Sequence, residues 1–324
     1  MRASAWTLLL FCGCSLRYDP CFAPATEVSA LQLLSISPDP PQARIAPDGS
    51  VEPTALHVLF ADPLRSGEHI DVKGSLCPLD GNSCESFNIA GEPDGQMSFL
   101  VQPSPALMRA AVTGDPLHGF EAVRLKMSFD AKSPTAVESG EKLLVFSRPG
   151  EVPNGPFQIV GVEVRRLVHE HRERFDRVYP PDEETLAPGA TLQVDVGDPV
   201  WLRPILSPGA AEEYDTTDLT GKAVHLREQI SYTFHSTGHV NFGYDSAGEP
   251  EPGQTSDLPG LTYLSYLRFR GGAGSVWIVA RDSRGAQSWL ALNLTATDAR
   301  TCADPRFGVP CELLEVSCQD TAPR

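Results

Sequence analysis

Apolar and polar residues alternate along most of the chain with the two-residue period of β-strands. In the first half, this alternation predicts strands over residues 31–36, 54–60, 70–76, 97–101, 122–129 and 142–146. In the second half, it predicts strands over residues 157–164, 191–196, 201–206, 229–235, 261–270, 275–282 and 287–297. Only residues 105–112 and 167–177 fit short helices. Strands without helices between them predict antiparallel sheets and argue against parallel βαβ units.

A segment rich in proline and glycine, residues 148–156, divides this pattern into two halves. Such a composition is typical of a connection between domains. The second half opens like the first, because Ala187-Pro188-Gly189 echoes Ala46-Pro47-Asp48-Gly49 shortly after the opening strand. The spacing is longer in the second half, and we interpret the charged segment 169–184 as an insertion. The pattern is consistent with two copies of one module.

These observations predict an all-β protein with two antiparallel β-sandwich domains in tandem. The expected boundaries are 28–147 for the first domain, 148–156 for the linker and 157–299 for the second domain. A cysteine-containing tail over residues 300–324 completes the chain.

The sequence from Gly274 to Gly285, followed by Trp289, resembles the closing hairpin of immunoglobulin-like or PKD-like modules. Such modules recur in surface lipoproteins of myxobacteria. The opening strand, which ends in Pro-Asp-Pro-Pro, and the pair Cys77 and Cys84 resemble the first module of the same proteins. The resemblance implies two immunoglobulin-like sandwiches and a surface location, and it carries no activity with it.

Within this closing hairpin, alternation predicts which side chains face the core. Successive residues of a strand point to opposite faces of its sheet. We expect Trp277 and Val279 to face the core, and the residues between and beside them to face away. On the next strand, the core positions are Leu290, Leu292 and Leu294. Residues 282–285 should form the turn, with Gly285 at positive φ.

Residues 1–13 have the organisation of a lipoprotein signal peptide. One positive charge is followed by an apolar run over residues 5–12, far shorter than the roughly 20 residues needed to span a bilayer. Phe11-Cys12-Gly13-Cys14 resembles a lipobox, in which a small residue precedes the lipidated cysteine. We therefore expect Cys14 to carry the lipid, with a tether over residues 14–27.

The rival interpretation is simple secretion with cleavage after Ala25, where Ala23 and Ala25 would form an A-x-A site. That cleavage would leave a long, charged segment between the apolar run and the cut, which is unusual for a secretory signal. In the lipoprotein interpretation, Ser15 follows the lipidated cysteine. Because an aspartate there resembles an inner-membrane retention signal, a serine favours the outer membrane.

The cysteine content supports export. Removing Cys12 with the signal peptide and assigning Cys14 to the lipid leaves an even number of cysteines, as an oxidising compartment favours. The candidate disulfide residues are Cys21, Cys77, Cys84, Cys302, Cys311 and Cys318. The pairs Cys77/Cys84 and Cys302/Cys311 are close enough in sequence to staple local loops, which would leave Cys318 for Cys21. Sequence alone does not choose among the possible connectivities.

The formal net charge of −16 argues against binding to nucleic acid, which requires clustered Lys and Arg. The charge is typical of a soluble, self-repelling surface. No calcium-loop pattern occurs, and we expect no metal or other cofactor. His169 and His171, and likewise His235 and His239, have spacings that a metal site can use. Their polar or glycine-containing surroundings favour surface histidines instead.

The chain contains no G-x-S-x-G elbow and no glycine-rich phosphate loop. We therefore expect a non-catalytic protein, held at the outer membrane by its lipid, that serves in binding, adhesion or envelope assembly. Its expected partners are the membrane, other envelope proteins and surface glycans. The candidate contact loop contributes Tyr244, Asp245, Glu249, Glu251 and Asp257. The alternative is an extracytoplasmic hydrolase whose active site is built from loops and lacks a linear motif.

Overall fold

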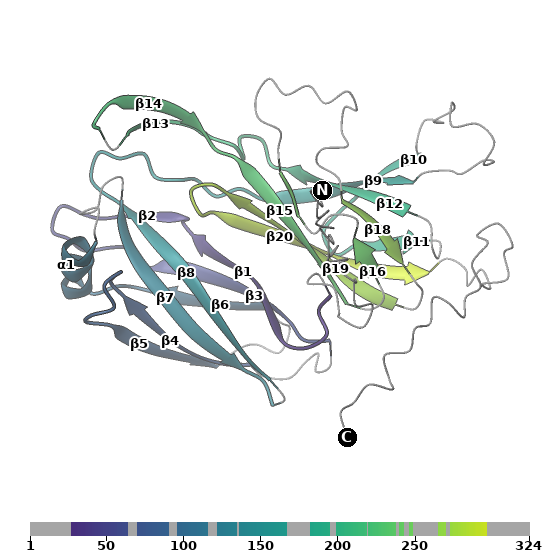
Figure 1. Ribbon diagram of the computed structural model, residues 1–324, viewed down its shortest axis with the longest axis horizontal. Helices are drawn as coiled ribbons and strands as arrows, with labels where there is room; N and C mark the ends of the chain where they lie inside the picture. The colour runs from purple at the N-terminus through teal and green to yellow at the C-terminus, as the bar shows by residue number, and fades with distance from the viewer. Residues whose placement is uncertain are drawn as a thin grey trace, which may run out of the picture. The chain divides into compact units, whose positions relative to one another are not determined.

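The computed structural model describes most of the chain between residues 27 and 296, and these residues belong to one compact unit. The described ranges are 27–63, 70–90, 96–115, 122–134, 136–166, 182–194, 199–218, 220–237, 240–242, 246–248, 265–269 and 273–296. Within these ranges the chain forms strands and one helix (Figure 1). The predicted all-β class is confirmed.

The first sandwich consists of two sheets whose inner faces share one core. The smaller sheet has the strand order β1 (Gln32–Asp39), β3 (Thr54–Ala61), β6 (Gln96–Val101). The larger sheet has the order β2 (Gln42–Arg44), β8 (Val137–Ser147), β7 (Val123–Lys132), β4 (Asp71–Cys77), β5 (Glu85–Ala90). Leu56 of the smaller sheet and Leu125 and Met127 of the larger one are fully buried in this core. The alternation along β7 is the sequence pattern that predicted it.

The only helix among the described residues, α1 (Pro105–Gly114), packs against the first core. Ser104 caps its N-terminus by accepting a hydrogen bond from the amide of Leu107 at 3.1 Å, and Pro105 occupies the first turn. Leu107, Met108 and Ala111 form its buried stripe. The helix predicted over 105–112 is therefore present. No helix in the described part of the chain is long and apolar enough to cross a membrane.

The second sandwich also has two sheets around one core. One sheet has the order β10 (Asp182–Leu186), β9 (Ile159–Arg166), β12 (Pro199–Leu206), β18 (Ser265–Phe269), β16 (Val240–Phe242). The other has the order β11 (Thr191–Val194), β20 (Gln287–Ala296), β19 (Ala273–Asp282), β15 (Ile230–Ser236), β17 (Ser246–Gly248). Leu202 and Leu267 of the first sheet and Phe234 of the second are fully buried between them. A separate two-stranded ribbon is formed by β13 (Glu213–Thr217) and β14 (Ala223–Arg227).

The two sandwiches share an unusual strand connection. In each, a short strand near the start of the sandwich pairs in parallel with the last strand of the sandwich. These parallel pairs are β2 with β8 and β11 with β20. The strands beside them also follow the same order, β8-β7-β4-β5 in one sandwich and β20-β19-β15-β17 in the other. This agreement supports the interpretation of two copies of one module.

The closing hairpin forms as expected, but the faces of β19 are exchanged relative to the prediction. Gly285 has φ 103° in the turn, as predicted. Leu290, Leu292 and Leu294 lie in the second core, also as predicted. The residues of β19 that join them there are Val276, Ile278 and Ala280. Trp277 and Val279 lie on the opposite face. The prediction failed because both faces of β19 are covered, so alternation could not tell one from the other.

Candidate functional site

A third apolar cluster joins the two sandwiches. Its buried members are Val28, Leu34, Leu59 and Ala61 from the N-terminal half and Val279 from β19, and the partly buried Trp277 and Trp289 pack against them. We use the term junction for the region where the two sandwiches meet. Trp277 thus covers a contact between sandwiches and is not an anchor of the second core. An indole suits such a place, because it contributes a large apolar area and a polar N–H at its edge.

Hydrogen bonds from β1 of the first sandwich reinforce this contact. The side-chain oxygen of Gln287 accepts from Ser35 Oγ at 2.8 Å and from the amide of Ile36 at 3.2 Å. The carbonyl oxygen of Gln287 accepts from Ser37 Oγ at 2.5 Å. Arg281 Nη2 donates to the carbonyl of Leu34 at 3.0 Å. Because these bonds run along one strand, β1 is held against the sheet that contains β20.

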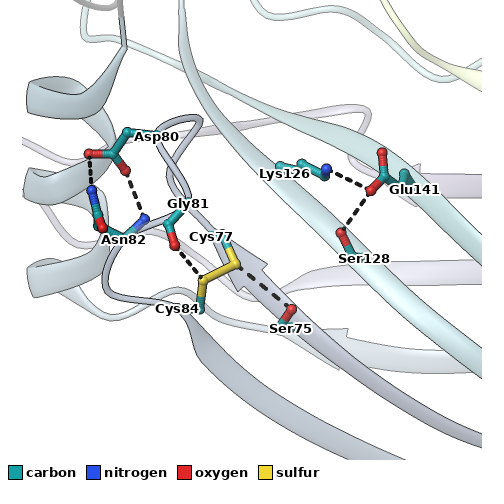
Figure 2. Close-up of a disulfide and its surroundings, with 9 residues drawn as sticks. All are labelled: Ser75, Cys77, Asp80, Gly81, Asn82, Cys84, Lys126, Ser128 and Glu141. Atoms are coloured by element: carbon teal, nitrogen blue, oxygen red, sulfur yellow. Dashed lines mark hydrogen bonds and ion pairs between the residues drawn. A yellow bond between two sulfur atoms is a disulfide. The ribbon is translucent and has the colours of Figure 1, made fainter.

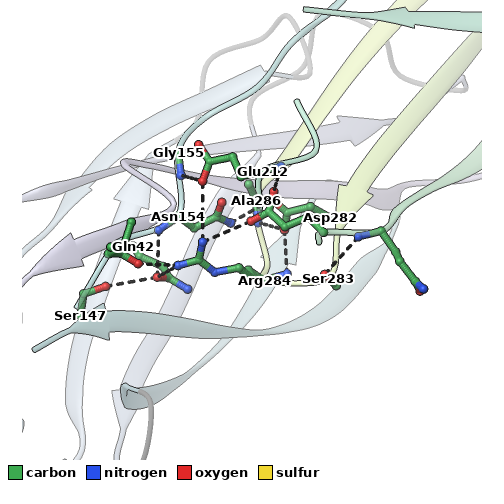
Figure 3. A network of polar contacts seen from close by, with 12 residues as sticks. Gln42, Ser147, Asn154, Gly155, Glu212, Asp282, Ser283, Arg284 and Ala286 are labelled. Atoms are coloured by element: carbon green, nitrogen blue, oxygen red, sulfur yellow. Dashed lines mark hydrogen bonds and ion pairs between the residues drawn. The ribbon is translucent and has the colours of Figure 1, made fainter. Parts of the chain in front are cut away.

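A second, charged group of contacts surrounds Arg284, in the turn between β19 and β20 (Figure 3). Its Nη2 atom donates to Gln42 Oε1 at 3.1 Å and to the carbonyl of Val152 at 2.7 Å. Its Nη1 atom donates to Glu228 Oε1 at 3.3 Å. The guanidinium carbon also lies 4.4 Å from the centre of the Tyr214 ring, at the base of the β13–β14 ribbon. One side chain therefore connects both sandwiches, the segment between them and the ribbon.

The segment predicted as a linker, residues 148–156, takes part in this network. The side-chain nitrogen of Asn154 donates to Asp282 Oδ2 at 2.8 Å, and its backbone amide donates to Gln42 Oε1 at 3.0 Å. Asn154 is only 2% exposed. Asp282 also accepts, through Oδ1, the amides of Arg284 and Ala286 and so fixes the turn. Because Asn154 is buried and hydrogen-bonded, we do not expect early proteolysis at this end of the segment, whereas Val152 is 66% exposed.

Burial at the junction shifts the pKa values of several groups. It raises the pKa of Asp282, and it raises the pKa of Glu228, where Asp282 and Glu212 add repulsion that Arg284 partly offsets. Burial, together with the charge of Arg281, lowers the pKa of Lys142 to about 8 and that of His235 to about 4. Lys142 donates from Nζ to the carbonyl of Gly285 at 2.8 Å, so it links the first sandwich to the turn of the second. These pKa shifts occur in titratable groups that are enclosed by other parts of the protein.

Replacing Lys142 by methionine should stabilise the protein at pH 7. A lysine whose pKa falls from 10.5 to about 8 on folding destabilises the native state by up to about 3 kcal/mol below pH 8. Between pH 8 and 10.5 only the unfolded chain holds the proton, so the wild type gains stability as the pH rises. The advantage of Lys142→Met, measured by urea unfolding, should therefore shrink from pH 7.5 to pH 10. A difference that is constant with pH would contradict this assignment.

The structure contains a disulfide between Cys77 and Cys84, which closes the loop between β4 and β5 (Figure 2). Within that loop, Asp80 accepts hydrogen bonds from the backbone and side-chain nitrogens of Asn82 at 3.0 Å. The bridge restricts the unfolded chain at this hairpin and so stabilises the first sandwich. The lipidation candidate Cys14 and the other cysteine candidates, Cys21, Cys302, Cys311 and Cys318, lie outside the described residues.

The remaining predicted site residues are not brought together among the described residues. Tyr244, Asp245, Glu249, Glu251 and Asp257 of the candidate contact loop lie outside the described ranges, as do His169, His171 and His239. His235 is half-buried on β15, and its Nε2 atom lies 3.3 Å from Thr233 Oγ1. Across the described ranges, no group of three or more His, Cys, Asp or Glu side chains is placed to hold a metal ion.

Sequence reasoning did not find the residues of the junction. Gln42 and Arg284 are 242 positions apart, and Asn154 and Asp282 are 128 apart. The one usable signal was the Asp-x-x-Gly turn, which was recognised as a turn but not as the centre of a contact. A buried network assembled from such distant segments has no linear pattern.

No protein-family model matches the chain, and a comparison with curated proteins finds no similar sequence. The structure is similar to red sea bream transglutaminase, with 9% identity and a TM-score of 0.25 over 83% of this chain and 32% of that one. It is similar to trypsin-activated alpha-2-macroglobulin from Escherichia coli, with 9% identity and a TM-score of 0.25 over 82% of this chain and 18% of that one.

A third similarity is to a chimeric titin Z1Z2 protein that carries a decorin KLER peptide. Here the identity is 12% and the TM-score 0.19, over 83% of this chain and 98% of that one. The chain spans about a third of the transglutaminase and less than a fifth of the macroglobulin. The fold class rests on the sheets described above, and we draw no functional conclusion from these similarities.

Proposed function

We propose that this protein is a non-catalytic surface lipoprotein, anchored in the outer membrane through Cys14, whose sandwiches carry a binding, adhesion or envelope-assembly surface. The observation that supports this function is the set of contacts that buried charged side chains make at the junction. Arg284 and Lys142 make hydrogen bonds across the junction, to Gln42 and to the carbonyl of Gly285. Within the second sandwich, Glu228 pairs with Arg284, and Asp282 accepts the backbone amide of Arg284. These contacts hold the two sandwiches against each other.

A locked pair of sandwiches suits the presentation of a surface. Binding sites on rigid sheets keep their geometry better than sites on isolated loops, and a rigid support reduces the entropy lost on binding. The signal-peptide pattern and the lipobox-like Phe11-Cys12-Gly13-Cys14 support an envelope location. An envelope protein of this kind would meet two classes of partner, other envelope proteins and surface glycans.

Lipidation is tested directly in the producing cell. Metabolic labelling with a palmitate analogue should mark the wild-type protein and place it in the membrane fraction. Cys14→Ala should abolish both the label and the membrane association, while Cys21→Ala, the next cysteine after Cys14, should keep both. A labelled Cys14→Ala protein would show that another residue carries the lipid. An unlabelled wild type that begins after Ala25 would show simple secretion.

The functional class is tested with the purified full chain in detergent. It is applied to a panel of envelope glycans and envelope proteins, beside a panel of chromogenic hydrolase substrates. The proposal expects retention on at least one envelope component without turnover of any substrate. Turnover that survives further purification and follows the protein peak would instead support the extracytoplasmic hydrolase.

A further inference from the structure

The ribbon formed by β13 and β14 extends from the second sandwich as an ordered arm (Figure 1). No described side chain between residues 213 and 227 belongs to any of the three apolar clusters. Both ends of the arm are nevertheless fixed. At its base, the amide of Glu228 donates to the carbonyl of Glu212 at 2.9 Å. At its tip, Asp218 Oδ1 accepts the amides of Thr220 and Lys222.

One edge of this ribbon is open in the described part of the chain. β14 pairs with β13 alone. The base bond described above, and a tip bond from the amide of Asp218 to the carbonyl of Lys222 at 2.9 Å, fix the hydrogen-bond pattern of the ladder. Bonded and non-bonded pairs alternate in an antiparallel ladder, so the even-numbered residues of β14 bond to β13. The amides and carbonyls that point away from β13 are therefore those of Ala223, His225 and Arg227.

The two edges of the ribbon differ in charge. β13 carries Glu213, 65% exposed, and Asp215, 87% exposed, and charges on an edge strand oppose its pairing with another chain. β14, with the sequence Ala-Val-His-Leu-Arg, has no acidic residue. Its Leu226 is 42% exposed, and its Arg227 is exposed without a polar side-chain partner among the described residues. In a chain with a formal charge of −16, this edge is the one suited to meet another copy.

The described part of the ribbon also lacks the strands that such an arm needs. A two-stranded ribbon alone is marginally stable in water, and three or more strands with a shared apolar face are required for independent stability. Register places four residues on one face of the ribbon: Tyr214, Thr216, Val224 and Leu226. Tyr214 contacts Arg284 at the base, but Val224 and Leu226 belong to no apolar cluster of the described residues. Further strands beside β14 would cover both of them.

We propose that two copies of this protein associate by pairing β14 with β14 of the second copy, antiparallel about a two-fold axis at His225. The result is a four-stranded sheet in the order β13, β14, β14, β13. Ala223 then lies opposite Arg227 of the second copy, and Val224 lies opposite Leu226. This register pairs the whole of β14 and uses every outward backbone group of the strand. The inference goes beyond the proposed function and does not depend on what the sandwiches bind.

The antiparallel arrangement also brings opposite charges together. Lys222 at the tip is exposed, and the register continued by one residue places it at the base of the second copy's ribbon. That base carries three carboxylates and one cation, namely Glu212, Glu228, Asp282 and Arg284. Asp218 lies one strand further from this base. At the axis, each His225 keeps Asp215 of its own chain at 2.8 Å, which offsets the charge of an imidazolium.

Disulfide trapping with the purified full chain in detergent tests the pairing, and it accumulates even a weak complex. Residues that face each other in a hydrogen-bonded antiparallel pair have Cα atoms about 5.5 Å apart, which suits a disulfide. Under a mild oxidant, His225→Cys should form a covalent dimer about tenfold faster than the wild type. Asp215→Cys, on the other edge and even more exposed, is the matched control and should behave like the wild type. In a cysteine scan of residues 223–227, dimer formation should be fastest at 225.

Two proline substitutions test whether the backbone of β14 carries the association. In the His225→Cys variant, Arg227→Pro removes an amide that points outward from β14, and Asp215→Pro removes one that points outward from β13. Neither removes a hydrogen bond between the two strands of the ribbon. Arg227→Pro should slow dimer formation about tenfold, and Asp215→Pro should leave it unchanged. The melting temperature of each variant confirms that it is folded.

Other outcomes overturn the inference in distinct ways. Equally fast dimer formation by Asp215→Cys would show collisions of exposed cysteines without a specific pairing. A fastest position other than 225 would refute the two-fold axis, and an unaffected rate in Arg227→Pro would refute backbone pairing. In the producing cell, cross-linking of His225→Cys to a different envelope protein without the dimer would show that β14 pairs with that partner instead.

Discussion

Arg284→Met should lower the free energy of unfolding by about 3–5 kcal/mol, the usual cost of removing one partner of a buried ion pair. The Glu228 side chain is only 1% exposed, and Arg284, 11% exposed, is the cation whose attraction opposes the rise in the pKa of that carboxyl. The substitution also removes hydrogen bonds to Gln42 and to the carbonyl of Val152. Chemical denaturation of the full chain measures the effect. Arg109→Met, on the exposed side of α1, is the matched control and should cost less than about 1 kcal/mol.

The dependence of this loss on pH distinguishes a charge effect from a packing effect. A carboxyl whose pKa is raised on folding destabilises the native state as the pH rises through that pKa. Without Arg284, the pKa of Glu228 rises further, so the deficit of Arg284→Met should be larger at pH 8 than at pH 5. Adding Glu228→Gln should recover part of the loss, because no uncompensated charge then stays buried. An equal deficit at both pH values, with no recovery in the double variant, would indicate lost packing alone.

The sequence predicted the secondary structure correctly where only one face of a strand or helix is buried. Only one face of β7 packs on the first core, so buried and less buried residues alternate along the strand, and the sequence shows this alternation. The helix predicted over residues 105–112 is present as α1, where Ser104 caps the start and Pro105 lies in the first turn. The turn at Gly285 was visible because few residues other than glycine accept its φ of 103°.

The sequence did not predict the structure where both faces of a strand are buried or where contacting residues are far apart in the chain. Val279 and Ala280 are adjacent on β19 and both fully buried, one at the junction and one in the core. Because both residues are apolar, the alternation of apolar and polar positions does not show which of them faces the second core. The short strand β2, only three residues long and containing Gln42 and Arg44, has too few apolar positions to register as a strand. It is fixed instead by its pairing with β8, which only the folded chain reveals.

Trp277→Ala should cost about 2–4 kcal/mol, somewhat less than the range for truncating a fully buried aromatic, because Trp277 is only partly buried. The physical loss is specific to the junction. The indole packs against a cluster formed by Leu34, Leu59 and Val279, so its removal leaves apolar surface of both sandwiches facing a cavity. The two cores themselves, to which Trp277 does not belong, keep all their members.

Because the loss falls on the contact between sandwiches, it should change the cooperativity of unfolding as well as its midpoint. Scanning calorimetry of the wild type should show one transition, and Trp277→Ala should split it into two as each core melts separately. Trp201→Ala is the informative comparison, since that tryptophan lies on the outward face of the other sheet. It should keep a single transition. A single, strongly lowered transition in Trp277→Ala would mean that this side chain supports the second core after all.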